Sequence, residues 1–305
     1  MTRREWLAAA LPGALLSARE RADLSRISVI TDETARTPAE AIAFARQYGL
    51  SWVELRSVPG LRKSYTDLSE AELREAARQL AGSGLKVSFL NSGMFKITLP
   101  ETEPVFRRPE SEQARASRIA RHAERFQKRH EDLRNAVRAA QILGTDLIRC
   151  FGFLRVAEPS AALPRVAEIV GEMAALAEKE GIRLLVENET SCNVATSYEL
   201  ADLMRLLPSR SAGINWDPYN GRHFGEVPFP DGYKALPKER IGNVQIKGRS
   251  LLYPEERLDW KTIFQTMIDD GYKGRFGLET HIFGEKQIHY SHESMKEILR
   301  LLEAS

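Results

Sequence analysis

The sequence has few cysteines and no long apolar run, and each shortage excludes a class of protein. Only two cysteines, Cys150 and Cys192, occur among its 305 residues, too few for a disulfide scaffold or a zinc cluster. Both are expected to follow neighbouring strands at one end of the fold. A disulfide between them stays open, although we favour two separate buried thiols. No segment reaches the ~18 consecutive apolar residues of a spanning helix, so we expect no stable membrane association.

Basic clusters are also missing from the chain. The formal net charge is only +2, and no long run of lysine and arginine is present. Such a run is the usual footprint of a nucleic-acid-binding surface, so a nucleic-acid partner is not expected. The content of 43% hydrophobic and 28% charged residues is that of an ordinary globular protein.

The first 22 residues differ from the rest of the chain. A pair of arginines precedes a short apolar stretch at 7–16, and small residues follow it. This arrangement resembles the signal of the bacterial twin-arginine export route. We therefore predict a signal peptide over 1–22, a mature domain over 23–305 and a periplasmic location. The alternative is a short N-terminal helix of a cytoplasmic protein, which Pro12 disfavours because proline breaks short helices.

Segments with the pattern of strands alternate with segments with the pattern of helices along the mature chain. The first strand is followed by "DETART", which lacks the glycines of a dinucleotide-binding turn, so a Rossmann-type sheet is not expected. Eight strand–helix units in about 280 residues instead predict an α/β protein with a single domain, a (β/α)8 TIM barrel. The predicted strands are 27–31, 51–56, 85–90, 146–151, 182–187, 212–217, 242–247 and 275–280.

Capping signals divide the segments between the strands into helices. Ser69 and Thr196 each begin a capping box, and Asp259 is a further N-cap. The connection at 97–118 is long and irregular. Because it follows the third strand, we expect it at the end of the barrel where active sites of this fold lie. The predicted helices begin at Pro38, after Ser69, at 112 (continuing to 143), near Leu163, after Thr196, after Asp259 and at Ser291.

Polar side chains stand at the carboxyl ends of five predicted strands. Alternate strand residues point into a barrel, and the last of them crown its catalytic end. Carboxylates gathered there repel one another and lose hydration, so they need compensating positive charge. The convergent residues are Glu54 and Arg56, Glu187 and Glu189, Asn215 and Asp217, Gln245 and Lys247, and Glu279 and His281.

Two kinds of compensation are open for these carboxylates. One is a single divalent cation, and an oxygen-rich ligand set suits Mn²⁺ or Mg²⁺ better than structural Zn²⁺. The other is neutralisation by nearby arginine and lysine side chains. The predicted metal ligands are Glu187, Asp217, Gln245 and Glu279, and the side chains that would neutralise them instead are Arg56, Arg149 and Lys247.

Four segments carry a family resemblance. "LLVENET", "GINWDPYN", "NVQIKG" and "GLETH" resemble the signature segments of the xylose isomerase-like TIM barrels, a superfamily of sugar isomerases, epimerases and dehydratases. The resemblance extends over the mature chain and implies one divalent metal ion on the four ligands named above. Gln245 stands where the family more often has histidine, and Gly248 replaces an aspartate of the same run. Glutamine at this position is known in dehydratase branches of the family.

The resemblance also implies a reaction. In epimerase relatives two metal-binding glutamates remove and return a proton beside a carbonyl, and these roles fall to Glu187 and Glu279. Lys247 would stabilise the resulting enediolate, and His281 would carry a second proton. We therefore expect a metal-dependent carbohydrate isomerase or epimerase that works through a metal-stabilised enediolate of a sugar, cyclitol or related polyol. Expulsion of a leaving group from the same enediolate would make the protein a dehydratase or lyase of the inosose or 3-oxo-glycoside type.

The last predictions concern alternative functions and the residues that would contact a substrate. An endonuclease IV-like phosphodiesterase would need several histidines at strand ends, and most of the six histidines lie elsewhere. A non-catalytic barrel that binds carbohydrate stays open because of Gln245 and Gly248, and so does assembly into a homo-oligomer. The residues predicted to contact a small-molecule carbohydrate are Glu54, Arg56, Arg149, Trp216 and Tyr219, whereas Lys96 and Arg155 are predicted to form salt bridges.

Overall fold

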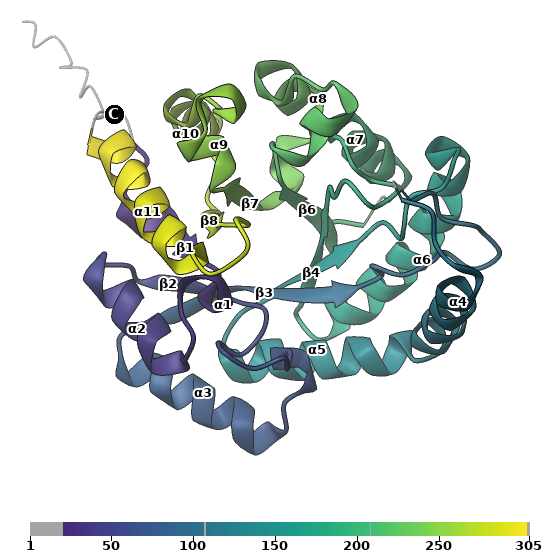
Figure 1. Cartoon of the computed structure of the whole chain (residues 1–305), viewed down its shortest axis with the longest axis horizontal. Coiled ribbons are helices and arrows are strands. Elements are labelled where there is room, and N and C mark those ends of the chain that lie inside the picture. Colours follow the sequence, from purple (N-terminus) through teal and green to yellow (C-terminus); the bar gives the residue numbers. More distant parts are fainter. Residues whose placement is uncertain (1–20, 107, 208, 304–305) are drawn as a thin grey trace, which may run out of the picture.

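Eight parallel strands form a nearly closed barrel with helices around it (Figure 1). The computed structural model describes residues 21–106, 108–207 and 209–303, so the predicted signal peptide lies almost wholly outside the described residues. All eight predicted strands are confirmed. The strands are β1 (Ile27–Val29), β2 (Trp52–Leu55), β3 (Lys86–Met94), β4 (Leu147–Phe151), β5 (Arg183–Glu187), β6 (Ala212–Trp216), β7 (Ile241–Lys247) and β8 (Arg275–Glu279).

The strands follow one another around the barrel in sequence order. Neighbours pair in the order β1-β8-β7-β6-β5-β4-β3-β2, and one parallel bridge between Ile30 and Glu54 closes the ring between β1 and β2. In the register of β7 and β8, Gln245 stands opposite Gly277 and Lys247 stands opposite Glu279. The predicted (β/α)8 barrel is therefore confirmed.

Local capping explains where several of the surrounding helices begin. Complete capping boxes are present at Ser69 and Thr196, and the side chains of Thr37 and Asp259 each accept a backbone N–H as N-caps. The helices are α1 (Thr31–Thr34), α2 (Pro38–Gln47), α3 (Glu70–Gly82), α4 (Glu112–Gln127), α5 (Arg129–Leu143), α6 (Pro159–Lys179), α7 (Ser197–Leu206), α8 (Tyr233–Ala235), α9 (Arg249–Leu252), α10 (Trp260–Asp269) and α11 (Gln287–Glu303).

The long helix predicted over 112–143 is wrong as a single element. The chain breaks at Lys128, which ends α4 and precedes α5. α5 buries an apolar face that includes Leu133 and Val137 against the barrel, whereas Arg118 is the only buried residue of α4 in the described chain. Because only α5 packs closely on the sheet, the two halves need different directions, and neither glycine nor proline marks the break.

Two other helix starts were predicted about one turn too late. α6 begins at Pro159, since proline suits the first helical position, where no intrahelical N–H bond is lost. α11 begins at Gln287 rather than at Ser291. The Ser291 hydroxyl is buried and donates to the backbone oxygen of Glu33 at 2.9 Å, so it ties the helix to α1 instead of capping it.

Alternation along β7 separates the core from the barrel interior. Val244 and Ile246 are fully buried in the apolar core, whereas Gln245 and Lys247 point into the barrel, where they contact side chains of other strands. Both cysteines are buried and free, so the prediction of two separate thiols is confirmed. Within the described part of the chain, helices fall short of the length and apolar character that crossing a bilayer requires.

Candidate functional site

Three carboxylates from three strands meet at one end of the barrel. Glu187 is the last residue of β5, Asp217 directly follows β6, and Glu279 is the last residue of β8. One oxygen of each lies within 4.8 Å of an oxygen of the others, and all three side chains are buried. We call these three residues the acidic cluster. The structure thus brings together the carboxylates that the sequence predicted to converge.

Asp217 presents one of its oxygens to the cluster. Its Oδ1 accepts hydrogen bonds from the backbone N–H groups of Tyr219, at 2.9 Å, and of Asn220, at 3.2 Å. Its buried Oδ2 accepts no well-directed hydrogen bond, although Nζ of Lys247 lies 3.1 Å away. Burial raises the pKa of Asp217 to about 7, against the effect of the Lys247 charge. A buried carboxylate oxygen of this kind is stabilised by a proton or by a cation beside it.

Lys247 places an ammonium inside the acidic cluster. Its Nζ forms ion pairs with Asp217 and with Oε2 of Glu279, and its side chain is only 2% exposed. Burial alone would lower the pKa of Lys247, but the charges of Asp217, Glu279 and Glu187 outweigh it and raise this pKa well above its ordinary value. The lysine is therefore charged and neutralises part of the cluster.

Arg149 and Asn215 hold Glu187. Oε2 of Glu187 accepts hydrogen bonds from Nη1 of Arg149, at 3.1 Å, and from Nδ2 of Asn215, at 2.5 Å. Nε of the same arginine donates to the backbone oxygen of Ser92. Burial raises the pKa of Glu187, and the Arg149 charge only partly opposes this. Arg149 therefore binds a carboxylate of the cluster, and its contact with a substrate stays a prediction.

Glu279 has the opposite electrostatic environment. Its Oε1 accepts a hydrogen bond from Nη1 of Arg56 at 3.2 Å, while its Oε2 is bound by Lys247. Burial by itself raises the pKa of Glu279, but the charges of Lys247, Arg56 and Arg149 lower it below its ordinary value. Glu187 and Glu279 thus lie close together with their pKa values moved in opposite directions.

Two carboxylates of the site were missed in the sequence. Nη2 of Arg56 lies 2.8 Å from Asp32 and 2.9 Å from Glu33, so this arginine bridges both residues to Glu279. Asp32 and Glu33 follow β1 directly, in the run "ITDET", which is the signal that could have identified them. They lie on the single turn α1, where the alternation used for strands does not apply.

Gln245 and Glu54 lie inside the barrel. Oε2 of Glu54 accepts hydrogen bonds from Nε2 of Gln245 and from Asn91, both at 2.8 Å, and its Oε1 accepts from Ser28 and Asn243. Glu54 is fully buried with both oxygens engaged, so its predicted contact with substrate is wrong. Because Nε2 of Gln245 donates the hydrogen bond to Glu54, the amide oxygen is left over. This oxygen, Oε1, is buried without a hydrogen-bond partner.

His281 follows Glu279 on the outer side of the cluster. Its backbone is left-handed, with φ 46°, and its N–H donates to Oε2 of Glu33 at 2.8 Å. Burial and the Lys247 charge lower the pKa of His281 to about 4, against the pull of Glu279. Its ring packs edge-on against Phe283, whose side chain is exposed. The imidazole is therefore neutral near pH 7.

The two aromatic residues predicted to contact a sugar have different positions. Trp216 is fully buried, donates its ring N–H to the Ser197 hydroxyl at 2.9 Å and packs against Tyr233. It faces the helices outside the barrel, so the predicted contact with substrate is wrong. Tyr219 is half-buried beside Asp217, and its hydroxyl donates to Glu256.

Two further cations near the barrel mouth, Lys96 and Arg155, are also paired. Lys96 lies 3.0 Å from Glu189 and above the ring of Phe151, and Arg155 lies 2.9 Å from Glu199. These ion pairs confirm the salt bridges predicted for Lys96 and Arg155. Lys96 and Lys247 lower the pKa of Glu189 to about 2, although burial acts in the other direction.

The groups at the mouth fit a divalent cation. Oδ2 of Asp217 and Oε1 of Gln245 are buried oxygens without a hydrogen bond, and Mn²⁺ and Mg²⁺ prefer oxygen ligands. Carboxylates outnumber cations in this network by two, which is the charge of one such ion. The carboxylates are Asp32, Glu33, Glu187, Glu189, Asp217 and Glu279, and the cations are Arg56, Lys96, Arg149 and Lys247.

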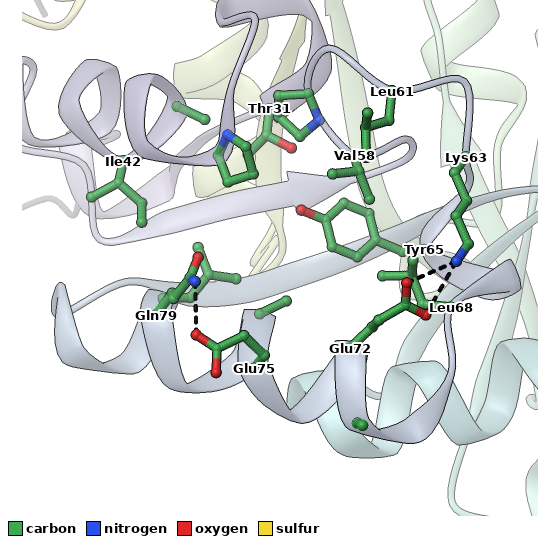
Figure 2. A pocket seen from close by; sticks show the side chains of 16 residues that line it. Thr31, Ile42, Val58, Leu61, Lys63, Tyr65, Leu68, Glu72, Glu75 and Gln79 are labelled. Atoms are coloured by element: carbon green, nitrogen blue, oxygen red, sulfur yellow. Dashed lines mark hydrogen bonds and ion pairs between the residues drawn. The ribbon is translucent and has the colours of Figure 1, made fainter.

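An apolar cavity lies elsewhere and lacks a cluster of buried carboxylates. It has a volume of about 430 Å³ and lies between α2, α3 and the loop after β2 (Figure 2). Four of its polar side chains form two pairs, Lys63 with Glu72 at 2.9 Å and Gln79 with Glu75 at 2.8 Å, and Oγ1 of Thr31 is buried there without a hydrogen bond. The barrel mouth is therefore the candidate functional site.

Comparison with known proteins agrees with this architecture. The model of the xylose isomerase-like TIM barrel family matches residues 42–304. The chain belongs to the xylose isomerase-like TIM barrel family. No curated protein sequence matches it.

Several solved structures share the fold at low sequence identity. The probable 3-DHS dehydratase AsbF from Bacillus anthracis is 15% identical with a TM-score of 0.67, over 90% of this chain and 98% of that one. The 3-keto-D-glucoside 4-epimerase YcjR from E. coli is 13% identical with a TM-score of 0.64, over 90% and 98%. The IolI protein, solved with a zinc atom, is 12% identical with a TM-score of 0.67, over 90% and 96%.

Proposed function

We propose that this protein is a metal-dependent carbohydrate isomerase or epimerase that removes a proton next to a carbonyl. The observation that supports this most strongly is the buried acidic cluster of Glu187, Asp217 and Glu279 at the barrel mouth. Three buried carboxylates are costly unless charge compensates them. Their concentration at the end where TIM barrels carry their active sites favours a functional reason over a structural one.

The acidic cluster and the amide oxygen of Gln245 would hold the divalent cation. When bound, such an ion polarises a carbonyl and makes the neighbouring C–H more acidic. The protein side chains have to hold the substrate, exclude water and move the proton. Asn215 and Arg149 keep Glu187 in place for that step, and Arg56 does the same for Glu279.

The opposite pKa shifts of the two glutamates support separate roles. Glu187, whose pKa is raised, is the group that we assign to accept the substrate proton near neutral pH. Glu279, whose pKa is lowered, remains an anion. The ammonium of Lys247 would stabilise the negative oxygen of the enediolate, and the neutral imidazole of His281 would pass a proton to or from the adjacent carbon.

The pairing of the mouth cations favours an uncharged substrate. Arg56, Arg149 and Lys96 each bind at least one carboxylate of this chain. A phosphate or carboxylate group on the substrate would have to break one of these pairs and enter a network with excess negative charge. A neutral ketose, cyclitol or glycoside needs only hydrogen bonds, which the same carboxylates accept.

A dehydratase or lyase that uses the same site is the second candidate. The observation in its favour is Gln245, because glutamine at this position is known in dehydratase branches of the family. Its first step would be the same proton removal by Glu187. The reaction would then differ because the C–O bond to a leaving group beside the enediolate breaks, and the departing oxygen takes up the proton that Glu187 removed. The substrates would be inososes or 3-oxo-glycosides.

Export through the twin-arginine route remains a proposal about location. It is based on the sequence of residues 1–22, of which 1–20 lie outside the described residues. That route carries folded proteins, which suits a domain that acquires its metal ion before export. A periplasmic location agrees with an uncharged substrate rather than a sugar phosphate.

A proton-exchange assay tests the proposed function. Neutral ketoses, inososes and 3-oxo-glycosides are incubated with the protein in D₂O, and deuterium incorporation or elimination is followed by NMR. We expect exchange with at least one substrate, its loss after treatment with EDTA and its recovery with Mn²⁺ or Mg²⁺. Glu187→Gln should slow the exchange by roughly 10²-fold or more, because positioned acid–base catalysis contributes that much.

Glu172→Gln is the matched control for that variant. Glu172 lies on the outer helix α6, where its side chain is 48% exposed, so exchange should be unchanged. Full exchange in the EDTA-treated protein would exclude the metal-dependent mechanism. No exchange with any substrate, in a protein that binds them, would instead indicate a non-catalytic carbohydrate-binding barrel.

A further inference from the structure

Lys247 contacts the oxygens of the acidic cluster that a metal ion would need. Its Nζ lies against Oδ2 of Asp217 and Oε2 of Glu279. The other oxygen of each carboxylate is engaged: Oδ1 of Asp217 accepts two backbone N–H groups, and Oε1 of Glu279 accepts Arg56. Because one ammonium reaches both remaining oxygens, these face a common point.

The other buried cations do not have this position. Arg149 binds Oε2 of Glu187, and Arg56 binds Oε1 of Glu279, so each arginine touches one carboxylate of the cluster. Among the residues that the structure describes, Lys247 alone forms ion pairs with two members of the acidic cluster. The arginines can stay in place beside a metal ion, whereas the lysine stands between the ligands.

An ammonium and a divalent cation exclude one another at these oxygens. Ions such as Mg²⁺ bind carboxylate oxygens at about 2.1 Å, closer than an ammonium does, and two like charges on the same oxygens repel strongly in a buried site. We infer that Lys247 occupies the position that a divalent cation requires, so that metal binding turns the lysine side chain out of the acidic cluster. This inference depends on the proposed metal-dependent function.

The lysine side chain is suited to two positions. Without a metal ion it neutralises buried carboxylates that otherwise repel one another. Its four-carbon stem is flexible, so the ammonium can move while the backbone of β7 stays paired with β8. Glu189, which pairs with Lys96, is a further carboxylate near enough to act on the Lys247 charge, and it offers a partner for the displaced ammonium towards the mouth. There Lys247 would face substrate oxygens.

Direct titration with Mn²⁺ tests the inference without any activity assay. Metal-free wild-type protein, Lys247→Met and Lys296→Met are titrated with Mn²⁺ by isothermal calorimetry. We expect Lys247→Met to bind Mn²⁺ roughly tenfold or more tightly than wild type, a change of about 1.4 kcal/mol. Lys296→Met removes an ammonium from an exposed pair with Glu293 on α11, outside the charge network of the barrel mouth, so its affinity should change by less than about threefold.

The possible outcomes separate this inference from the proposed function. Equal or weaker binding by Lys247→Met, beside a wild type that binds Mn²⁺, overturns the exclusion and leaves the metal-dependent function intact. Absence of binding in both proteins overturns both. If Lys247→Met does not fold, crystals of the wild type with Mn²⁺ decide. The expected result is Nζ beyond about 4 Å from Asp217, and an ion bound while Nζ keeps both contacts contradicts the inference.

Discussion

Two arginine–glutamate pairs in this protein have similar chemistry and very different surroundings. Arg149 and Glu187 meet at 3.1 Å inside the barrel, where their side chains are 7% and 1% exposed. Arg300 and Glu297 meet at 2.7 Å on α11, where their side chains are 61% and 17% exposed. The outer pair also has the better geometry, because Nε and Nη2 of Arg300 donate to separate oxygens of Glu297.

The comparison indicates that burial, rather than distance, decides how much an ion pair contributes to the free energy of unfolding. At the surface, water solvates both charges whether or not they meet, so an exposed pair contributes little. In the interior, the loss of one partner leaves the other charge without solvent or counter-charge, which is strongly destabilising. Arg149 therefore favours the charged form of Glu187 and holds this side chain at the candidate site, whereas Arg300 forms an ion pair on the surface of a helix.

Arg149→Met should have the largest effect on stability. The substitution leaves Glu187 buried beside Asp217 and Glu279 without its arginine, so we expect a loss of about 3 kcal/mol in the free energy of unfolding of the metal-free protein. Urea denaturation, followed by circular dichroism, measures this loss as a lower midpoint at an unchanged slope.

The double variant Arg149→Met/Glu187→Gln is the control for Arg149→Met. It removes both charges of the pair, so part of the lost stability should return, and the two single effects should not add. If the effects of the single substitutions simply add, the pair has no buried coupling, and the contrast with the outer pair disappears.

His122 on α4 is an intermediate case, and its effect depends on pH. Its Nδ1 accepts the backbone N–H of Thr98 at 3.0 Å, which requires the neutral imidazole. Burial lowers the pKa of His122 below its ordinary value of 6.5; Arg118 and two further arginines of α4 add to this, and Glu110 opposes it. Between the two pKa values the unfolded chain binds more protons than the folded chain. Stability is therefore full above pH 6.5 and declines as the pH falls below it.

A comparison with His122→Gln isolates this contribution. The difference in the free energy of unfolding between wild type and variant should shrink from pH 7 to pH 5 by less than about 1 kcal/mol, since solvent screens a partly exposed ring. Chemical denaturation at both pH values measures it. A difference that stays constant or grows in acid contradicts the predicted direction.

The fold was predictable because its signals are local. Capping boxes at Ser69 and Thr196 and alternating strand residues act within a few positions, and the structure confirms them. The break at Lys128 was not predictable, because α4 and α5 separate through packing against the barrel, which acts over long range. Local propensity is a weak guide where tertiary contacts decide the direction of a helix.

The same distinction applies to the candidate site. Alternation along the strands identified the carboxylates of the acidic cluster correctly, and it also excludes Trp216, which lies between the inward-pointing residues Asn215 and Asp217. The prediction for Trp216 followed its residue type and ignored its position. Sequence could not tell whether Lys247 would face a substrate or the carboxylates, because that depends on side-chain contacts between strands.

Arg300→Met should have the smallest effect and completes the comparison. The substitution is the same as in Arg149→Met, but it removes a surface pair of i,i+3 spacing that solvent screens, so the free energy of unfolding should change by less than about 0.5 kcal/mol. Urea denaturation under identical conditions provides the direct contrast with Arg149→Met. A loss as large as that from Arg149→Met would mean that the bidentate geometry of the outer pair matters more than its exposure. The difference between the two regions would then have to come from geometry instead of burial.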